Sequence, residues 1–184
     1  MPFTKTYPQP GILIAVATAL VGMCLFGFGF ESLMGAAMFG VTYQKIDDFV
    51  LQLGKGVHQL HAAGHTVKVY LSNAAPTAAS DTIKSTSTAT EITMTNEGNH
   101  GAGGGDVAND FTEASGTASL TGTDVVFAAS GGTVGPFRYV VMYNDTQTSP
   151  ADPLIAYWDY GSSLTLQDGE TFTVDFGASI FTLT

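Results

Sequence analysis

Two neighbouring runs of β-branched and aromatic residues, 137–143 and 153–161, constrain the fold of this chain more than any other feature. Such residues fit a pleated, half-buried surface. The first run is apolar at both sets of alternate positions, which is typical of a strand in the middle of a sheet. The polar stretch 144–153 between the runs is typical of a loop. We therefore expect the two strands to lie at the centre of a β-sandwich, with Trp158 as its largest packing group.

Shorter segments with a period of two follow residue 65 and are separated by turn residues. Expected strands are residues 67–71, 91–95, 117–121, 124–129, 163–166, 171–176 and 180–184. Asp168 and Gly169 form a strong turn signal, so we expect 163–166 and 171–176 to pair as a hairpin. The glycine-rich stretch 96–110 predicts a flexible loop. Turn signals every 8–12 residues indicate a sandwich or jelly roll rather than β-α-β units.

Residues 43–62 are the one segment that predicts an amphipathic helix. Apolar residues recur there at spacings of three and four and would form one stripe. The stripe consists of Ile46, Phe49, Val50, Leu53, Val57 and Leu60. Thr42 is the expected N-cap, and Gly64 is expected to end the helix.

The predicted fold class is therefore mainly β: a β-sandwich or jelly-roll-like domain preceded by one amphipathic helix and an apolar N-terminal segment. We expect the helix and the sandwich to form one domain over residues 42–184, with residues 1–41 as an N-terminal arm. The predicted core includes Phe49, Leu53, Val57, Tyr139, Val141, Trp158, Phe172 and Val174.

The N-terminal arm contains an uncharged apolar run at 11–30, which is long enough to cross a bilayer as a helix. Three interpretations remain open for this run. It is a transmembrane anchor, or a secretory signal with a cleavage zone of small residues at 35–37. Alternatively, it is an apolar arm buried against neighbouring subunits, or translated sequence upstream of a start at Val41.

The charge of the chain is uneven and argues against nucleic acid as a partner. The net charge is −10, and residues 1–64 contribute none of it. Residues 65–184 carry thirteen acids and only three cations, Lys68, Lys84 and Arg138. Binding phosphates requires clustered lysine or arginine. Only 12% of the residues are charged, so we expect a surface made largely of hydroxyl groups.

Three histidines, His58, His61 and His65, stand close together in the sequence. A zinc ion needs three or four converging ligands, and no cysteine or glutamate lies beside these residues to complete a set. We expect a solvated helix end and no metal. Cys24 is the only cysteine, so it forms no intrachain disulfide, and nothing near it would lower its pKa.

Carboxylates offer two further candidate sites, and neither has a matching pattern. Asp106, Asp110 and Glu113 flank the glycine-rich stretch and could hold calcium, but their spacing is not that of an EF-hand. Asp159 and Asp175 could serve as a glycosidase pair. We expect a solvated loop in the first case and a solvated sheet face in the second. The sequence thus predicts no enzyme and no cofactor.

Arg138 is the only arginine of the chain and lies between two aromatic residues. Guanidinium groups favour planar, bidentate partners. We expect Arg138 to form either a structural salt bridge or a contact with another subunit.

Several short motifs extend across most of residues 41–184. They are GVHQL at 56–60, VKVYLSN at 67–73, GPFRY at 135–139, YNDT at 143–146, WDYG at 158–161 and DGETF at 168–172. Together they resemble a group of small virion proteins of tailed bacteriophages, of the capsid decoration (cement) type. This resemblance implies a structural, homo-oligomeric protein on the capsid surface, with the major capsid protein or other virion proteins as partners. The alternative is a membrane-anchored or secreted β-sandwich surface or adhesion protein, which would meet a membrane only through residues 11–30.

Overall fold

The computed structural model describes residues 35–37 and 42–184, so the run at 11–30 and its three interpretations lie outside the described residues. The described chain is mainly β, with antiparallel sheets. None of its helices is long and apolar enough to cross a membrane. In chain order the elements are β1 (Gly35–Ala37), β2 (Thr42–Lys45), α2 (Asp47–Gly54), β3 (Val67–Ser72), the 3-10 helix η2 (Lys84–Thr86), β4 (Gly105–Asp106), β5 (Asp110–Ala114), β6 (Thr117–Thr121), β7 (Val125–Ala128), β8 (Val134–Asn144), β9 (Leu154–Leu166), β10 (Thr171–Val174) and β11 (Phe181–Leu183).

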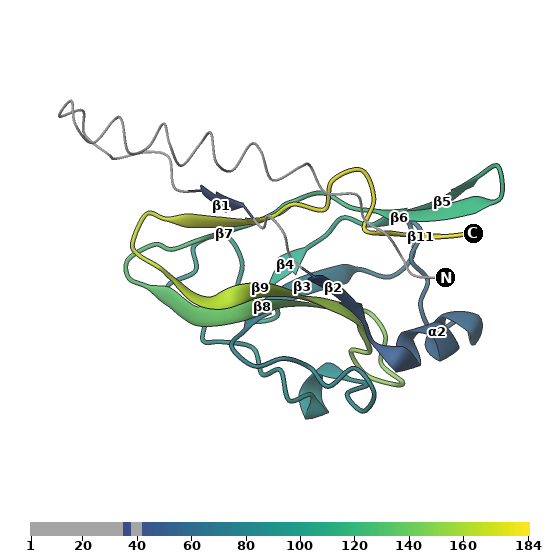
Figure 1. Ribbon diagram of the computed structural model, residues 1–184, viewed down its shortest axis with the longest axis horizontal. Helices are drawn as coiled ribbons and strands as arrows, with labels where there is room; N and C mark the ends of the chain where they lie inside the picture. The colour runs from purple at the N-terminus through teal and green to yellow at the C-terminus, as the bar shows by residue number, and fades with distance from the viewer. Residues whose placement is uncertain (1–34, 38–41) are drawn as a thin grey trace.

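The strands form two layers, which Figure 1 shows one above the other. One layer is the antiparallel sheet β2-β9-β8-β3-β4, and the other contains the sheets β1-β10-β7 and β11-β6-β5. Aromatic rings join the layers: Phe137 of β8 lies 5.0 Å from Phe172 of β10, measured between ring centroids. Burying such rings removes large apolar areas from water, and this burial holds the layers together.

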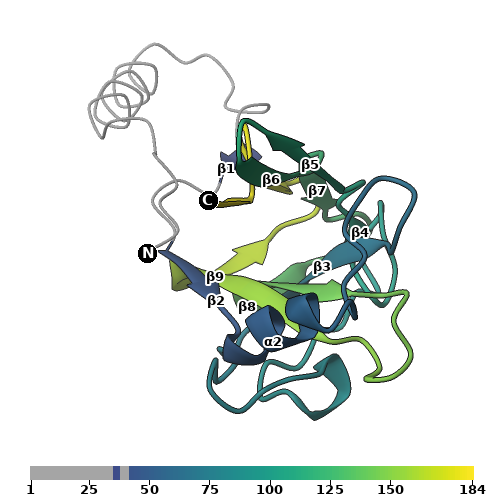
Figure 2. The same ribbon diagram turned by 90° about the vertical axis from the view of Figure 1, so that its right-hand side faces the viewer.

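The opposite face of the five-stranded sheet is covered by the segment between β3 and β4, which includes η2 (Figure 2). The Tyr70 hydroxyl of β3 donates a hydrogen bond to the Ala89 carbonyl of this segment at 2.8 Å. The helix α2 lies at one end of the layers.

The predicted central strands are β8 and β9, which pair with each other, and β8 is the middle strand of its sheet. Val140 lies opposite Trp158 in this pair. The Trp158 ring is buried against Tyr43 and Phe176, at centroid distances of 5.6 and 5.8 Å. Among the predicted core residues, the buried ones are Phe49, Val141, Trp158, Phe172 and Val174, and the half-buried ones are Leu53, Val57 and Tyr139.

The predicted helix at 43–62 is too long. Its first residues form β2, which pairs with β9 and places Tyr43 opposite Trp158. The N-cap is Ile46 rather than Thr42. Residues 42–45 can also form a strand, and pairing with β9 provides hydrogen-bond partners for their backbone N–H and C=O groups.

The helix also ends earlier than expected, at Gly54 rather than near Gly64. Gly56 follows with a φ of +74°, a left-handed conformation that a helix does not continue through. Within α2 only Phe49 is fully buried, while Val50 and Leu51 are 51% and 54% exposed. The predicted apolar stripe is therefore only partly used for packing.

The hairpin expected around Asp168 and Gly169 is not formed. β10 pairs with β7 in antiparallel orientation and with β1 in parallel orientation, and it does not pair with β9. Through Leu166, β9 remains paired with β8. The turn instead carries the chain from one layer to the other, and the Gly169 amide donates to the Ala129 carbonyl at 2.9 Å.

The stretch at 96–110 contains more regular structure than predicted. Gly105–Asp106 forms β4 and pairs with β3, with Asp106 opposite Lys68. The strand expected at 91–95 is reduced to a single bridge between Ser72 and Glu91. β1 lies within the segment predicted as a separate arm, and it pairs with β10.

Candidate functional site

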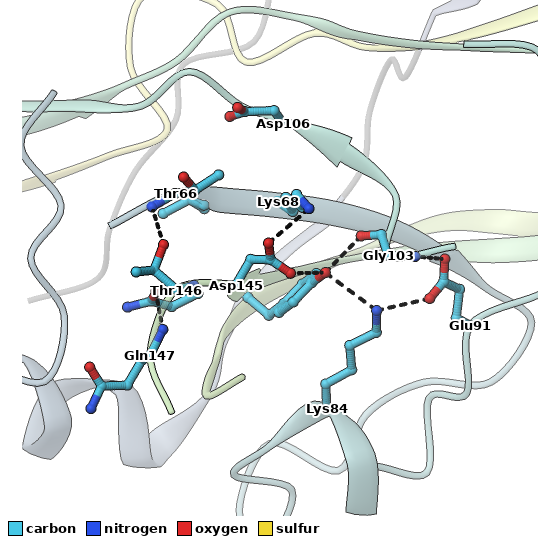
Figure 3. Close-up of polar contacts among 12 residues, drawn as sticks. Thr66, Lys68, Lys84, Glu91, Gly103, Asp106, Asp145, Thr146 and Gln147 are labelled. Atoms are coloured by element: carbon cyan, nitrogen blue, oxygen red, sulfur yellow. Dashed lines mark hydrogen bonds and ion pairs between the residues drawn. The ribbon is translucent and has the colours of Figure 1, made fainter. Parts of the chain in front are cut away.

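A network of charged and polar groups surrounds the Tyr143 hydroxyl at the edge of the sheet and its covering segment. Figure 3 labels Lys68 of β3, Lys84 of η2, and the loop residues Glu91, Gly103 and Asp145. We call the following set the Tyr143 network: Lys68, Lys84, Glu91, Gly103, Tyr143 and Asp145. Apart from Tyr143 and Asp145, which lie two residues apart, these residues come from segments far apart in the chain.

The Tyr143 hydroxyl lies 2.8 Å from the Gly103 carbonyl oxygen and 2.9 Å from Asp145 Oδ1. It has one proton to donate between these two acceptors. Asp145 Oδ2 also accepts from Lys68 Nζ at 2.8 Å. This half of the network ties the glycine-rich loop to β3 and β8.

Lys84 reaches the network from the covering segment. Its Nζ lies 4.8 Å from the centroid of the Tyr70 ring and 4.4 Å from that of Tyr143, within the range of cation–π attraction. Nζ also pairs with Glu91 Oε2 at 2.8 Å, and Glu91 Oε1 accepts from the Gly103 amide at 2.7 Å. Lys84 therefore links the covering segment to both the sheet and the glycine-rich loop.

Electrostatics keep the Tyr143 hydroxyl neutral. Burial raises the pKa of Tyr143, and the nearby carboxylates of Asp145 and Glu91 raise it further. For Asp145, burial alone would raise the pKa, but hydrogen bonds from Lys68 and Tyr143 hold it below its usual value. The phenol is therefore neutral and lies beside an ionised carboxylate whose two oxygens accept from Tyr143 and Lys68.

Arg138 forms the structural salt bridge that was one of its two predicted roles. Its Nε and Nη2 donate to the two Asp159 oxygens at 2.7 and 2.8 Å, and this bidentate bond holds the pKa of Asp159 below its usual value. Asp175 is exposed, and its carboxylate accepts from the nearby Gly177 amide. A contact of Arg138 with another subunit stays a prediction.

The histidine prediction was wrong for His58, which is only 5% exposed. Its ring packs on Phe49 at a centroid distance of 5.1 Å. The Asn144 amide nitrogen lies 3.2 Å from His58 Nδ1 and 3.0 Å from His65 Nδ1. His61 alone of the three is exposed. Among the described residues, no group of three or more His, Cys, Asp or Glu side chains is placed to hold a metal ion.

The three carboxylates around the glycine-rich stretch bind separate backbone amides. Asp106 accepts from Ala108, and Asp110 accepts from Ala62, at 2.8 and 3.0 Å. Glu113 accepts from Gly116 in the turn between β5 and β6. Each carboxylate has its own local role, and they do not gather around a common point.

Sequence reasoning missed two buried carboxylates, Asp81 and Glu97. Asp81 Oδ2 accepts from the Thr77 and Thr88 amides, both at 2.9 Å. Glu97 is 6% exposed and accepts from the Ala128 amide of β7 at 2.9 Å. Their one signal in the sequence is that each is a single acid among small and polar residues.

The sequence matches no protein-family model, no curated protein and no solved structure.

Proposed function

We propose that the chain is a structural virion protein of the capsid decoration type. In this role it binds as a homo-oligomer between subunits of the major capsid protein, on the outer surface of a phage head. The sequence motifs quoted above support this role, and so does the way the described residues use their charges.

The observation that carries the proposal is the internal pairing of every cation in residues 65–184. Lys68, Lys84 and Arg138 each form an ion pair, with nitrogen–oxygen distances of 2.8, 2.8 and 2.7 Å. Lys68 and Lys84 fasten loops to the sheet and Arg138 joins β8 to β9, so none of the three is left free for phosphates or for a substrate. What remains on the surface is acidic and rich in hydroxyl groups, which suits many modest contacts summed over a lattice.

We further propose that the two layers form a β-sandwich of jelly-roll type with α2 at the end that meets the capsid. Crossings of the chain between layers at 129–134 and 167–170 support this topology. Val50 and Leu51 support the docking role of α2, since they are large apolar side chains exposed on neighbouring positions of one helix.

The test begins with mass spectrometry of purified virions, which is expected to find the chain as a component with many copies. Added to capsids that lack it, the full chain is expected to reach saturable occupancy and to raise the temperature at which the capsids break open. Replacing Val50 and Leu51 together by lysine is expected to weaken this binding at least tenfold. Val126→Lys is the matched control, because Val126 is an exposed valine on β7, outside α2.

The alternative, a membrane-anchored or secreted surface protein, rests on the apolar run at 11–30. It predicts that the full chain binds lipid vesicles, that deleting 11–30 abolishes this binding, and that capsids do not bind the chain. That set of results would replace the capsid proposal.

A further inference from the structure

Asn144, the last residue of β8, is fully buried and joins two histidines. Its side-chain oxygen accepts hydrogen bonds from the backbone amides of Thr146 and Gln147, both at 3.2 Å. Its side-chain nitrogen lies 3.2 Å from His58 Nδ1 and 3.0 Å from His65 Nδ1. All four polar positions of this amide are therefore in use.

This arrangement fixes the protonation of both rings. Backbone N–H groups can only donate, so the atom that faces Thr146 and Gln147 must be the Asn144 oxygen. The Asn144 nitrogen then donates one hydrogen to each ring. Each ring must present an unprotonated Nδ1 and carry its proton on Nε2.

A charged imidazole does not fit here. Protonation puts a hydrogen on Nδ1, so two donors face each other where one hydrogen bond existed. Turning the Asn144 amide over would relieve that clash but would set its NH2 group against the amides of Thr146 and Gln147. The first outcome breaks one buried hydrogen bond and the second breaks the two from Thr146 and Gln147, and breaking them is costly.

The surroundings of His58 add to this cost. Its Nε2 is buried and has no hydrogen-bond partner among the described residues. Burial lowers the pKa of His58 to about 4, and His65 lowers it as well, while Asp48 of α2 acts in the opposite direction. The charged residue that follows β8, Asp145, is paired with Lys68 and Tyr143.

Both histidines lie in the connection between α2 and β3, residues 55–66. Other hydrogen bonds also hold this connection: Asn109 Nδ2 donates to the Leu60 carbonyl at 2.7 Å, the Ala62 amide donates to Asp110 at 3.0 Å, and the Thr66 amide donates to the Thr146 hydroxyl at 2.9 Å. We propose that His58, His65 and Asn144 form an acid-sensitive latch, which releases residues 55–66 from β8 when the His58 imidazole takes up a proton. The latch depends only on these contacts and would operate whether or not the chain is a capsid protein.

The test is amide hydrogen exchange of the full chain between pH 7.5 and 4.5, corrected for the intrinsic pH dependence of exchange. Free imidazole binds a proton below about pH 6.5, so opening becomes easier as the pH falls below that value. Protection of residues 57–66 is expected to fall by up to about tenfold per pH unit. Protection of β8 and β9 around Val140 and Trp158 is expected to stay constant. Equal protection of 57–66 at both ends of the range would overturn the proposal.

Asn144→Asp is the most discriminating variant. It replaces the amide nitrogen by an oxygen, which can accept a hydrogen bond from a protonated Nδ1 on each ring. Its pH dependence is expected to reverse, with protection of 57–66 level or rising from pH 7.5 to 5.5. The same acid loss as in the wild type would refute the latch. His61→Gln is the matched control, since His61 is exposed in the same connection, and it is expected to behave as the wild type.

A measurement on the wild-type chain covers the case in which Asn144→Asp does not fold. Nitrogen NMR shifts at pH 7.5 distinguish the two neutral tautomers of histidine. His58 and His65 are both expected to carry their proton on Nε2. A proton on Nδ1 of either ring would contradict the latch directly.

Discussion

The Lys84 ammonium contacts two tyrosine rings and one carboxylate, and every one of these contacts depends on its charge. The side chains of Lys84 and Glu91 are only 19% and 15% exposed. A half-buried pair of this kind contributes little over an apolar replacement of both partners, yet removing one partner leaves the other charge uncompensated.

Lys84→Met keeps most of the side-chain length and removes the charge. It is expected to lower the free energy of unfolding by about 1–3 kcal/mol, since Glu91 loses its charged partner. Urea unfolding monitored by Trp158 fluorescence measures this. Lys55→Met at the exposed end of α2 is the control and should change the value by less than about 0.5 kcal/mol. If the two variants are equally stable, the Tyr143 network contributes nothing to stability.

Trp158→Ala tests the centre of the five-stranded sheet. Trp158 is 4% exposed and packs on Tyr43 and Phe176, so its loss leaves a cavity that the layers can fill only in part. The expected cost is about 3–5 kcal/mol, measured by urea unfolding with circular dichroism. Val126→Ala, at a 37% exposed position, should cost less than about 1 kcal/mol. A melting temperature unchanged by Trp158→Ala would mean that the ring is not part of the core.

At the scale of elements, the glycine-rich stretch before β4 is defined by how closely it approaches β3. Gly104 has a φ of +78°, and a Cβ added there would lie 2.0 Å from the Val69 carbonyl oxygen. Gly101, three residues earlier, has open space around the same position. The stretch therefore contains both a glycine that packing requires and one that it does not.

Gly104→Ala is expected to destabilise the protein by at least about 2 kcal/mol, because both the backbone conformation and the contact with β3 exclude a side chain. Gly101→Ala is the matched control and is expected to change stability by less than about 0.5 kcal/mol. Thermal unfolding of both variants provides the comparison. If the two substitutions changed stability equally, the close approach to β3 would not be what requires a glycine at 104. The flexible loop predicted from the sequence would then describe this stretch better.

The strands predicted most accurately are those whose residue pattern matches their position in a sheet. Residues 137–143 and 153–161 became β8 and β9 because residues apolar on both faces have few alternatives to the middle of a sheet. β10 was predicted as a strand but given the wrong partner, since Asp168 and Gly169 specify a turn and not which sheet the chain enters next. The start of the predicted helix became β2, because Tyr43 packs better opposite Trp158 than on a helix surface.

The candidate site was almost invisible in the sequence. Lys84, Glu91 and Asp145 look like isolated surface charges, and only the pairing of β3 with β8 and the path of the covering segment bring them together. His58 was misjudged for the same reason, because its burial depends on Phe49 and Asn144. The salt bridge of Arg138 was easier to predict, since a lone guanidinium between aromatic residues suggests a fixed partner.

For the whole molecule, the buried and half-buried ionisable groups define a pH range of maximum stability. His58 has a lowered pKa, so its contribution is complete above pH 6.5 and is lost as the pH falls toward about 4. Asp81, Asp145 and Asp159 have pKa values held below 3.8, so stability falls again in more acidic solution. At the alkaline end, burial raises the pKa of Tyr43. Tyr43 therefore ionises more readily in the unfolded chain, and the folded state loses stability as the pH rises above about 10.

Urea unfolding at intervals from pH 3 to 11 is therefore expected to show a plateau between about 6.5 and 10 and losses on both sides. Replacing His58 by phenylalanine, which cannot titrate, should remove the loss between 6.5 and 4 and leave the steeper acid loss in place. A profile that is flat down to pH 4 in the wild type would contradict the burial of a neutral His58.

Contacts in and beside the Tyr143 network join parts of the chain that are made at different times during synthesis. The Thr66 amide donates to the Thr146 hydroxyl, eighty residues away, and the Gly103 carbonyl waits for the Tyr143 hydroxyl, forty residues away. Closing such distant contacts is slow, because the chain between them must first lose its freedom. While the ribosome is still translating β8, the nascent covering segment and the glycine-rich stretch have no sheet to fasten to. We therefore expect both to become ordered only after β8 has left the exit tunnel.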